Sequence, residues 1–163
     1  MLNGGRKHDA TGRSSGAHKR KKFSRINGAW VPYRVEMLQS PAWRILSLSA
    51  RKLLNRLEIE LAGHAGHDNG RLPCTYEDFV TYGIDRHAIA PAIREAVALG
   101  FITYEQGCGG NSEFKHPNKF HLTYRNTDDA PPTDDWKSIQ NVEEARALAA
   151  SARKAPSNRR SKN

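Results

Sequence analysis

Cysteine and long apolar runs are both scarce in this 163-residue chain, which holds only Cys74 and Cys108. Two cysteines do not make the disulfide framework of a small secreted domain, and they favour a reducing compartment. No apolar run approaches the roughly 18 residues that a membrane-spanning helix needs. The charged, Gly-rich N-terminus also lacks the apolar segment of a secretory signal. We therefore expect a cytoplasmic protein with no membrane partner.

Catalytic and metal-binding patterns are lacking as well. The sequence shows no Ser/His/Asp or paired-carboxylate arrangement. The Gly-rich stretch that begins at Gly107 is not followed by Lys-Ser/Thr, so it does not match a phosphate-binding loop. His64 and His67, with Cys74 nearby, offer one pair of zinc ligands, but the second pair of a structural zinc site is missing. The sequence predicts no enzyme, no cofactor and no metal ion, with zinc and a small enzyme left as minor alternatives.

Apolar side chains are rare in residues 1–28, where only three aliphatic or aromatic residues follow Met1. So little apolar surface cannot offset the entropy of ordering the chain, which predicts a disordered basic tail. The tail is a candidate phosphate-contacting arm, and a solubilising segment is an equal alternative. The candidate DNA contacts in its densest basic stretch are Lys19, Arg20, Lys21 and Lys22.

The formal net charge of +9 is unevenly distributed along the chain. Residues 1–28 hold eight Lys or Arg and one acid, residues 29–124 hold ten of each, and residues 125–163 hold eight Lys or Arg and six acids. The basic excess therefore lies in the tails, while the central region is formally neutral. A basic tail binds any polyanion, so charge alone does not identify the partner.

Hydrophobic periodicity and capping residues predict one domain over residues 29–125, mainly α with a small β-hairpin (α+β). Thr75 and Asp78 form a near capping box at the start of one helix, and Asp85 caps the next. The predicted helices are Ala42–Leu46, Ala50–Ala62, Tyr76–Tyr82 and Arg86–Leu99.

Short extended segments accompany these helices. Arg71–Cys74 is predicted to be extended, because Pro73 disfavours a helical Leu72. Residues 101–105 and 119–124 are strands by composition, and the Gly-rich loop 107–118 between them predicts a hairpin. The three residues Gly83–Asp85 join the two later helices in the manner of a helix-turn-helix.

In this order, the segments resemble the winged helix-turn-helix family, with the hairpin as the wing. The segments that carry the resemblance are NGRLPCTYEDF (69–79), GID (83–85), IAPAIREAVALGFI (89–102) and FHLT (120–123). The chain looks most like small winged-helix regulators and replication proteins of bacterial plasmids, phages and other mobile elements. The resemblance implies binding to double-stranded DNA, and a place in the bacterial cytoplasm at the nucleoid.

The second helix of such a motif presents side chains from its N-terminal half to the major groove. Its i, i+3, i+4 stripe, which includes Ile89, Ile93 and Val97, is expected to face the core. The outward positions are then Arg86, His87, Ala90, Pro91 and Arg94. Arg86 and Arg94 are expected to contact guanine or phosphate, partly offset by Asp85 and Glu95.

The resemblance also implies DNA contacts from the wing. Lys115, His116 and Lys119 are the candidates, helped by Asn111 and Asn118. Ordinary solubilising charges on an exposed loop are the alternative interpretation.

Residues 126–163 are predicted to form an acidic, Pro-containing linker, a short helix over Val142–Lys154 and a basic end. Trp136 is expected to dock this helix on the domain or on a second copy, so a homodimer stays open. The leading hypothesis is a transcriptional regulator or replication-associated factor that binds double-stranded DNA. The alternative is a winged-helix protein-interaction module whose basic tails bind nucleic acid non-specifically.

Overall fold

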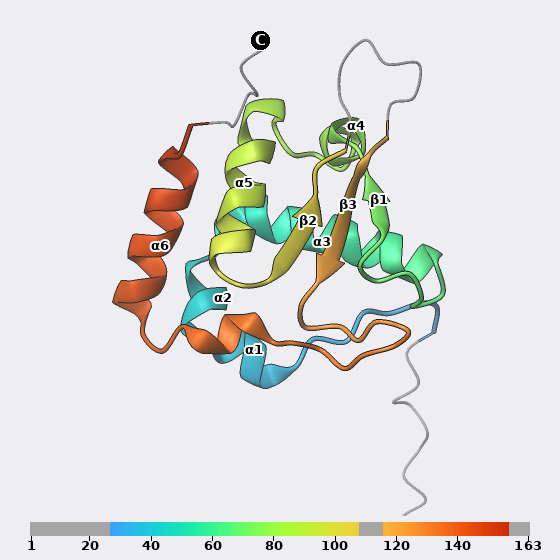
Figure 1. Ribbon diagram of the computed structural model, residues 1–163, viewed down its shortest axis with the longest axis horizontal. Coiled ribbons are helices and arrows are strands. Elements are labelled where there is room, and N and C mark those ends of the chain that lie inside the picture. Colours follow the sequence, from blue (N-terminus) through green and yellow to red (C-terminus); the bar gives the residue numbers. More distant parts are fainter. Residues whose placement is uncertain (1–26, 108–115, 157–163) are drawn as a thin grey trace, which may run out of the picture. The chain divides into compact units, whose positions relative to one another are not determined.

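The computed structural model describes residues 27–107 and 116–156, and the described residues from Val31 onward belong to one compact unit (Figure 1). Within these ranges the chain forms six α-helices, one 3-10 helix and three strands. Their order is α1 (Val35–Gln39), α2 (Pro41–Ile45), α3 (Leu48–Gly63), β1 (Leu72–Cys74), α4 (Tyr76–Thr81), α5 (Arg86–Ala98), β2 (Ile102–Glu105), β3 (Asn118–Leu122), η1 (Asp135–Ser138) and α6 (Val142–Lys154). This set of helices and strands confirms the predicted α+β class.

Side-chain caps explain where most of the helices begin. The Ser40 and Ser47 hydroxyls accept from the backbone N–H groups three residues later, and so begin α2 and α3. At α4, Thr75 accepts from the Asp78 N–H while the Asp78 carboxylate accepts from the Thr75 N–H, which confirms the capping box. The Thr75 hydroxyl also donates to the Asp78 carboxylate, and this hydrogen bond, followed by the one from the Thr75 N–H, holds the pKa of Asp78 below its usual range. Each cap satisfies backbone donors that a helix start otherwise leaves unpaired.

The sheet has three antiparallel strands in the order β1-β3-β2. The predicted hairpin is β2 with β3, in a register that pairs Tyr104 with Phe120. β1 adds to the other edge of β3 and pairs Leu72 with Phe120. Phe120 and Leu122 point inward and are buried, whereas Lys119 is exposed. The alternation is that of a sheet with one face on the core.

One hydrophobic core joins the helices and the sheet. α3 supplies Leu53, Leu54 and Leu57, all fully buried, and crosses behind the sheet (Figure 1). Phe79 of α4 meets Phe120 of β3 edge to face, with ring centroids 5.7 Å apart. This shared core fixes the positions of α4 and α5 relative to the hairpin.

The packed unit extends past the boundary predicted at residue 125. Trp136 and Ile139 near η1, and Ala145 and Ala149 of α6, are buried in the same core as the helices before them. The acidic segment before η1 is therefore part of the folded domain rather than a free linker. The hydrophobic effect explains this, because Trp136 and the alanine face of α6 cover apolar core surface that the earlier elements leave exposed.

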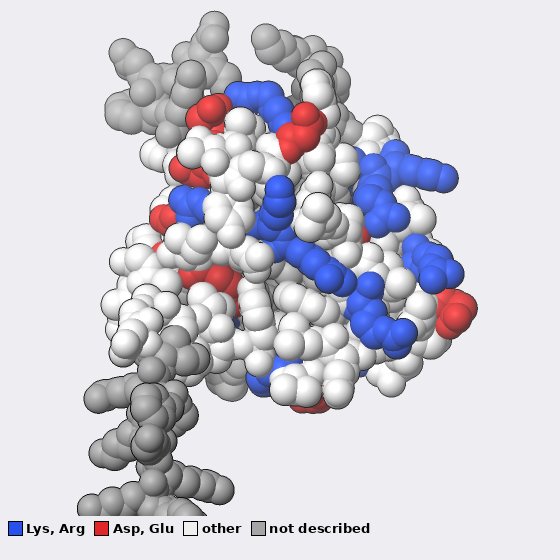
Figure 2. All heavy atoms as spheres, turned by 180° about the vertical axis from the view of Figure 1, so that it is seen from behind, with Lys and Arg blue, Asp and Glu red and all other residues white. Residues whose placement is uncertain are grey.

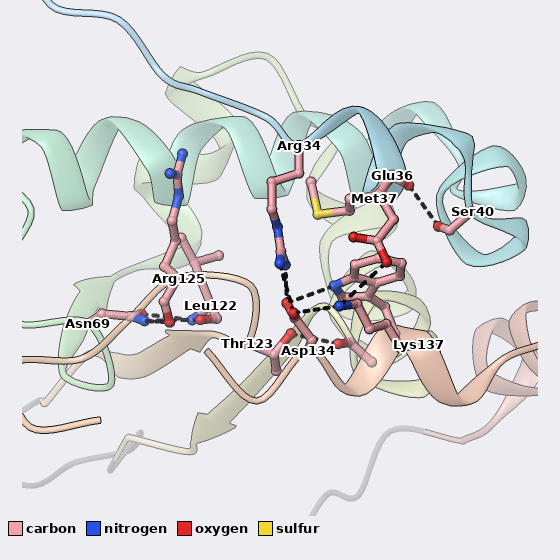
Figure 3. A network of polar contacts seen from close by, with 12 residues as sticks. Arg34, Glu36, Met37, Ser40, Asn69, Leu122, Thr123, Arg125, Asp134 and Lys137 are labelled. Carbon is pink, nitrogen blue, oxygen red and sulfur yellow. Dashed lines mark hydrogen bonds and ion pairs between the residues drawn. The ribbon is translucent and has the colours of Figure 1, made fainter. Parts of the chain in front are cut away.

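Two polar side chains secure this C-terminal segment (Figure 3). The buried Asn69 amide donates to the carbonyls of Leu122, Arg125 and Asn126 and accepts from the Leu122 N–H. The Asp134 carboxylate pairs with Arg34 and Lys137 and accepts from the Trp136 indole N–H. Together they hold the chain as it leaves β3 and as it enters η1.

No helix in the described part of the chain is long and apolar enough to cross a lipid bilayer.

Gly100 tests whether η1 is part of the folded domain. A Cβ on Gly100 would lie 2.6 Å from the Trp136 backbone nitrogen, and the residue has φ +74°. We therefore expect Gly100→Ala to lower the free energy of unfolding by about 2 kcal/mol or more, measured by urea denaturation. Gly70→Ala is the control, because Gly70 also has a positive φ, +103°, while nothing lies within 4 Å of its Cβ position. Equal stability of the two variants would contradict the packing of η1 on the domain.

Candidate nucleic-acid interface

The turn between α4 and α5 is compact and internally bonded. Gly83, with φ +91°, donates to the Val80 carbonyl, and buried Ile84 donates to the Phe79 carbonyl. Asp85 then accepts from the His87 N–H and begins α5. The Lys52 ammonium group of α3 donates to the Gly83 carbonyl, 2.9 Å away. The turn predicted from Gly83 to Asp85 is thus held by its own backbone hydrogen bonds and by Lys52 of α3.

The first turn of α5 presents Arg86 and His87 to solvent. Arg86 Nη2 lies 3.1 Å from the Glu77 carboxylate of α4, and both side chains are more than half exposed. Such a surface ion pair contributes about 0–1 kcal/mol and is screened by salt. A phosphate or base could therefore displace Glu77 from Arg86 at little cost.

Arg94, expected to face outward toward DNA, is used inside the protein instead. Its Nε and Nη2 donate to the carbonyls of Ala152 and Arg153, at 2.9 and 3.0 Å. These carbonyls belong to the last turn of α6, which otherwise lacks partners for them. The sequence placed Arg94 on the correct face of α5, but it could not reveal that the end of a helix 58 residues away covers that face.

Glu95, expected to offset surface arginines, is completely buried. Its carboxylate accepts from the Ser47 N–H at 2.8 Å, from the Ser47 hydroxyl at 2.7 Å and from Arg153 at 2.9 Å. The structure therefore removes Glu95 from the surface charge of α5. The prediction that Val97 faces the core was wrong, because its side chain is 39% exposed.

Ala90 and Pro91 lie on the partly exposed side of α5. Pro91 stands inside the helix, which runs unbroken from Arg86 to Ala98. Proline has no N–H, so the His87 carbonyl loses its usual backbone donor. α5 therefore begins at the predicted residue and continues through the proline.

Two half-exposed tyrosines near α5 were not among the predicted site residues. Tyr76 opens α4 and is 38% exposed, and Tyr104 of β2 is 39% exposed. Burial and then the nearby Tyr104 raise the pKa of Tyr76, whereas Arg94 lowers it. Tyr76 is thus a neutral hydroxyl donor at physiological pH, suited to a phosphate oxygen. Its place in the first turn of α4 is the signal that sequence analysis could have used.

For the loop that was expected to form a wing, the structure describes only the base, next to β2 and β3. His116 and Lys119 are exposed, and Lys119 is paired in register with Glu105 of β2. Asn118, predicted as a helper in DNA binding, accepts from the Gly107 N–H at 2.9 Å and so closes the base of the loop. The remaining predicted contacts, Lys115 and Asn111 of the wing and residues Lys19, Arg20, Lys21 and Lys22 of the tail, lie outside the described residues.

Cys74, His64 and His67, which were considered as zinc ligands, lie in surroundings that do not form a zinc site. Burial raises the pKa of the Cys74 thiol to about 12, so the thiolate that zinc requires is disfavoured. His64 lies 3.1 Å from Asp68, and His67 lies 2.8 Å from Asp128. Within residues 27–107 and 116–156, no three His, Cys, Asp or Glu side chains are grouped to hold a metal ion.

Comparison of the chain with protein-family models, curated proteins and solved structures found no match.

Arg94→Ala tests the contact between α5 and α6. The change leaves two carbonyls of α6 without their donor, and we expect faster amide hydrogen exchange at the end of α6. We also expect a loss of about 1–3 kcal/mol in the free energy of unfolding. Arg86→Ala, on the same helix but in a surface ion pair, is the control and should change neither quantity appreciably. Unchanged exchange in Arg94→Ala would show that the contact does not hold α6.

Proposed function

We propose that this chain is a winged helix-turn-helix protein that binds double-stranded DNA, as a transcriptional regulator or replication-associated factor. The observation that carries the proposal is the order α4, tight turn, α5, β2 and β3, with the first turn of α5 exposed. A helix-turn-helix places the N-terminal residues of its second helix against base edges. α5 is the second of the two helices joined by the turn, and the hairpin follows it directly as a wing would.

Arg86 and His87 are the proposed base-reading residues. An arginine can bond guanine O6 and N7 together, and both side chains lie at the positive end of the α5 dipole. Ala90, one turn further on, lets the helix approach the groove and can touch a thymine methyl group. Tyr76, Tyr104, His116 and Lys119 are proposed to contact the backbone on either side.

Arg94 has a different part in this proposal from the one its sequence position suggested. Because it binds the carbonyls of Ala152 and Arg153, it acts by holding α6 against α5. The basic C-terminal end, which includes Arg159 and Arg160, continues the chain from there. Removing it is therefore expected to weaken binding for all DNA sequences alike.

A protein-interaction module is the second candidate. The observation that favours it is the charge of the described residues, which hold 14 Lys or Arg and 15 Asp or Glu. Strong duplex binding normally shows an excess of basic residues on the domain itself. If residues 27–156 bind no DNA at low salt while the full chain recovers one stable protein partner, this second function is correct.

Arg86, His87 and Glu77 together test the proposed reading of DNA by α5. On a site selected from random duplexes, Arg86→Ala and His87→Ala should each reduce the preference for that site over unrelated DNA. For Arg86 the expected loss is about 1–3 kcal/mol, or roughly 5- to 150-fold, by fluorescence anisotropy. Glu77→Gln should strengthen binding, because it removes both a competitor for Arg86 and a negative charge.

Arg71→Ala is the matched control for Arg86→Ala. Arg71 is also an exposed arginine in a surface ion pair, with Asp68 at 3.0 Å, and it lies before β1. We expect it to leave site preference unchanged. Equal effects of the two substitutions, or no salt-sensitive binding by the full chain at low ionic strength, would refute DNA reading by α5.

A further inference from the structure

Five basic side chains lie on three helices, α2, α3 and α6, and we call them the basic belt. Figure 2 shows the face behind the view of Figure 1, where Lys and Arg extend across the centre and toward one side. The belt consists of Arg44 of α2, Arg51 and Lys52 of α3, and Arg146 and Arg153 of α6.

Hydrogen bonds to backbone carbonyls and to a buried carboxylate hold three members of the belt in place. Arg51 Nη2 donates to the carbonyls of Trp43 and Arg44, at 3.1 and 3.5 Å. Arg153 meets Ser47, the N-cap of α3, at the shared Glu95 carboxylate. Arg146 precedes Arg153 by seven residues, two helical turns, and so lies on the same side of α6. Lys52 follows Arg51 on α3, and its ammonium group donates to the Gly83 carbonyl in the turn before α5. The belt therefore extends from that turn along α3 to α2 and α6.

The charges of the belt are not neutralised by surface acids. Among the described residues, Arg44, Arg51, Lys52 and Arg146 have no carboxylate within 4.0 Å, and the Glu95 partner of Arg153 is fully buried. Six other described cations have carboxylate partners: Arg34, Arg56, Arg71, Arg86, Arg125 and Lys137. Arg94, Lys119 and Lys154 have none within 4.0 Å among the described residues. The belt thus holds five of the eight described cations that no surface carboxylate pairs with.

We infer that the basic belt is a second surface for the phosphate backbone of double-stranded DNA. This goes beyond the proposed function, because the belt shares no side chain with the residues that we propose to read bases. Arg and Lys that neutralise phosphates release counterions, which supplies sequence-independent affinity. Arg51 and Lys52 already donate to backbone carbonyls, which orients both side chains, so less side-chain entropy is lost when they bind a phosphate.

A duplex fits the belt better than a lipid surface does. The exposed large apolar side chains nearest to the belt in sequence are Leu48, at the start of α3, and Leu148 of α6, which are 71% and 38% exposed. Interfacial helices insert a whole apolar face, and one leucine on each of two helices does not provide it. Several cations spread over three rigid helices suit a rigid row of phosphates.

The test compares two double charge reversals in the full-length chain. Arg44→Glu with Arg146→Glu removes two exposed belt cations, whose side chains form no hydrogen bond with other described residues. Arg71→Glu with Lys137→Glu changes the net charge equally outside the belt. We expect the belt variant to bind all duplexes more weakly, with a plot of log K against log[salt] about 2 shallower in slope. The control pair should change this slope much less.

Thermal melting of both variants checks that they fold, and Arg44→Gln with Arg146→Gln replaces the reversal if it does not fold. Equal salt slopes for the belt and control variants would overturn the inference. So would a belt variant that loses binding to phosphatidylserine vesicles and keeps binding to DNA, or a wild-type chain that binds no duplex.

The α5 variants separate this inference from the proposed function. If Arg86→Ala loses site preference while the belt variant matches its control, the belt fails and reading by α5 stands. If the belt variant loses affinity for all duplexes while Arg86→Ala has no effect, the belt stands and reading by α5 fails.

Discussion

The arrangement of α3, α5 and α6 depends on the hydrogen bonds and the ion pair of the buried Glu95 carboxylate. A carboxylate out of contact with water is costly unless every oxygen has a partner, and here Ser47 and Arg153 supply them. Ser47 is the N-cap of α3, Glu95 belongs to α5 and Arg153 to α6. One side chain of α5 thus joins the start of one helix to the end of another. Removing either partner would leave a buried charge, so the three helices are expected to be displaced together.

This joint explains why the C-terminal segment belongs to the domain. Arg94 and Glu95 are consecutive, and both reach the last turn of α6, one through carbonyls and the other through Arg153. Trp136 adds apolar burial at the other end of the segment. α5 is therefore held along its length, which leaves its first turn, with Arg86 and His87, as the part that is free to meet a partner. A rigid helix with an exposed N-terminal turn is the geometry that groove reading requires.

Local signals in the sequence were sufficient for most of the elements. The Thr75 and Asp78 box and the Asp85 cap predicted where α4 and α5 begin, and the predicted bounds of α6 agree with the structure. α1 was missed because it is a five-residue helix whose N-cap, Arg34, makes no side-chain cap bond. The helical stripe placed Ile89 and Ile93 in the core correctly, but Val97 is 39% exposed at the far end of the same stripe.

The candidate site was harder to predict than the fold, because its charges have partners that are distant in sequence. Arg94 and Glu95 look like surface residues until α6, 58 residues later, folds over them. Arg86 was correctly expected to be exposed, yet its pairing with Glu77 follows from the angle between α4 and α5. The belt was equally hidden, because its members lie on α2, α3 and α6, which pack on one core only in the folded chain.

Amide chemical-shift mapping of the full chain, titrated with a selected DNA duplex, tests the central claim most directly. Our account predicts the largest specific changes in residues 86–90 at the start of α5, with further changes at His116 and Lys119. These α5 changes should be absent when an unrelated duplex of equal length is used. Salt-sensitive binding that shifts only residues outside α5 and the wing, identically for both duplexes, would contradict the claim that α5 reads DNA.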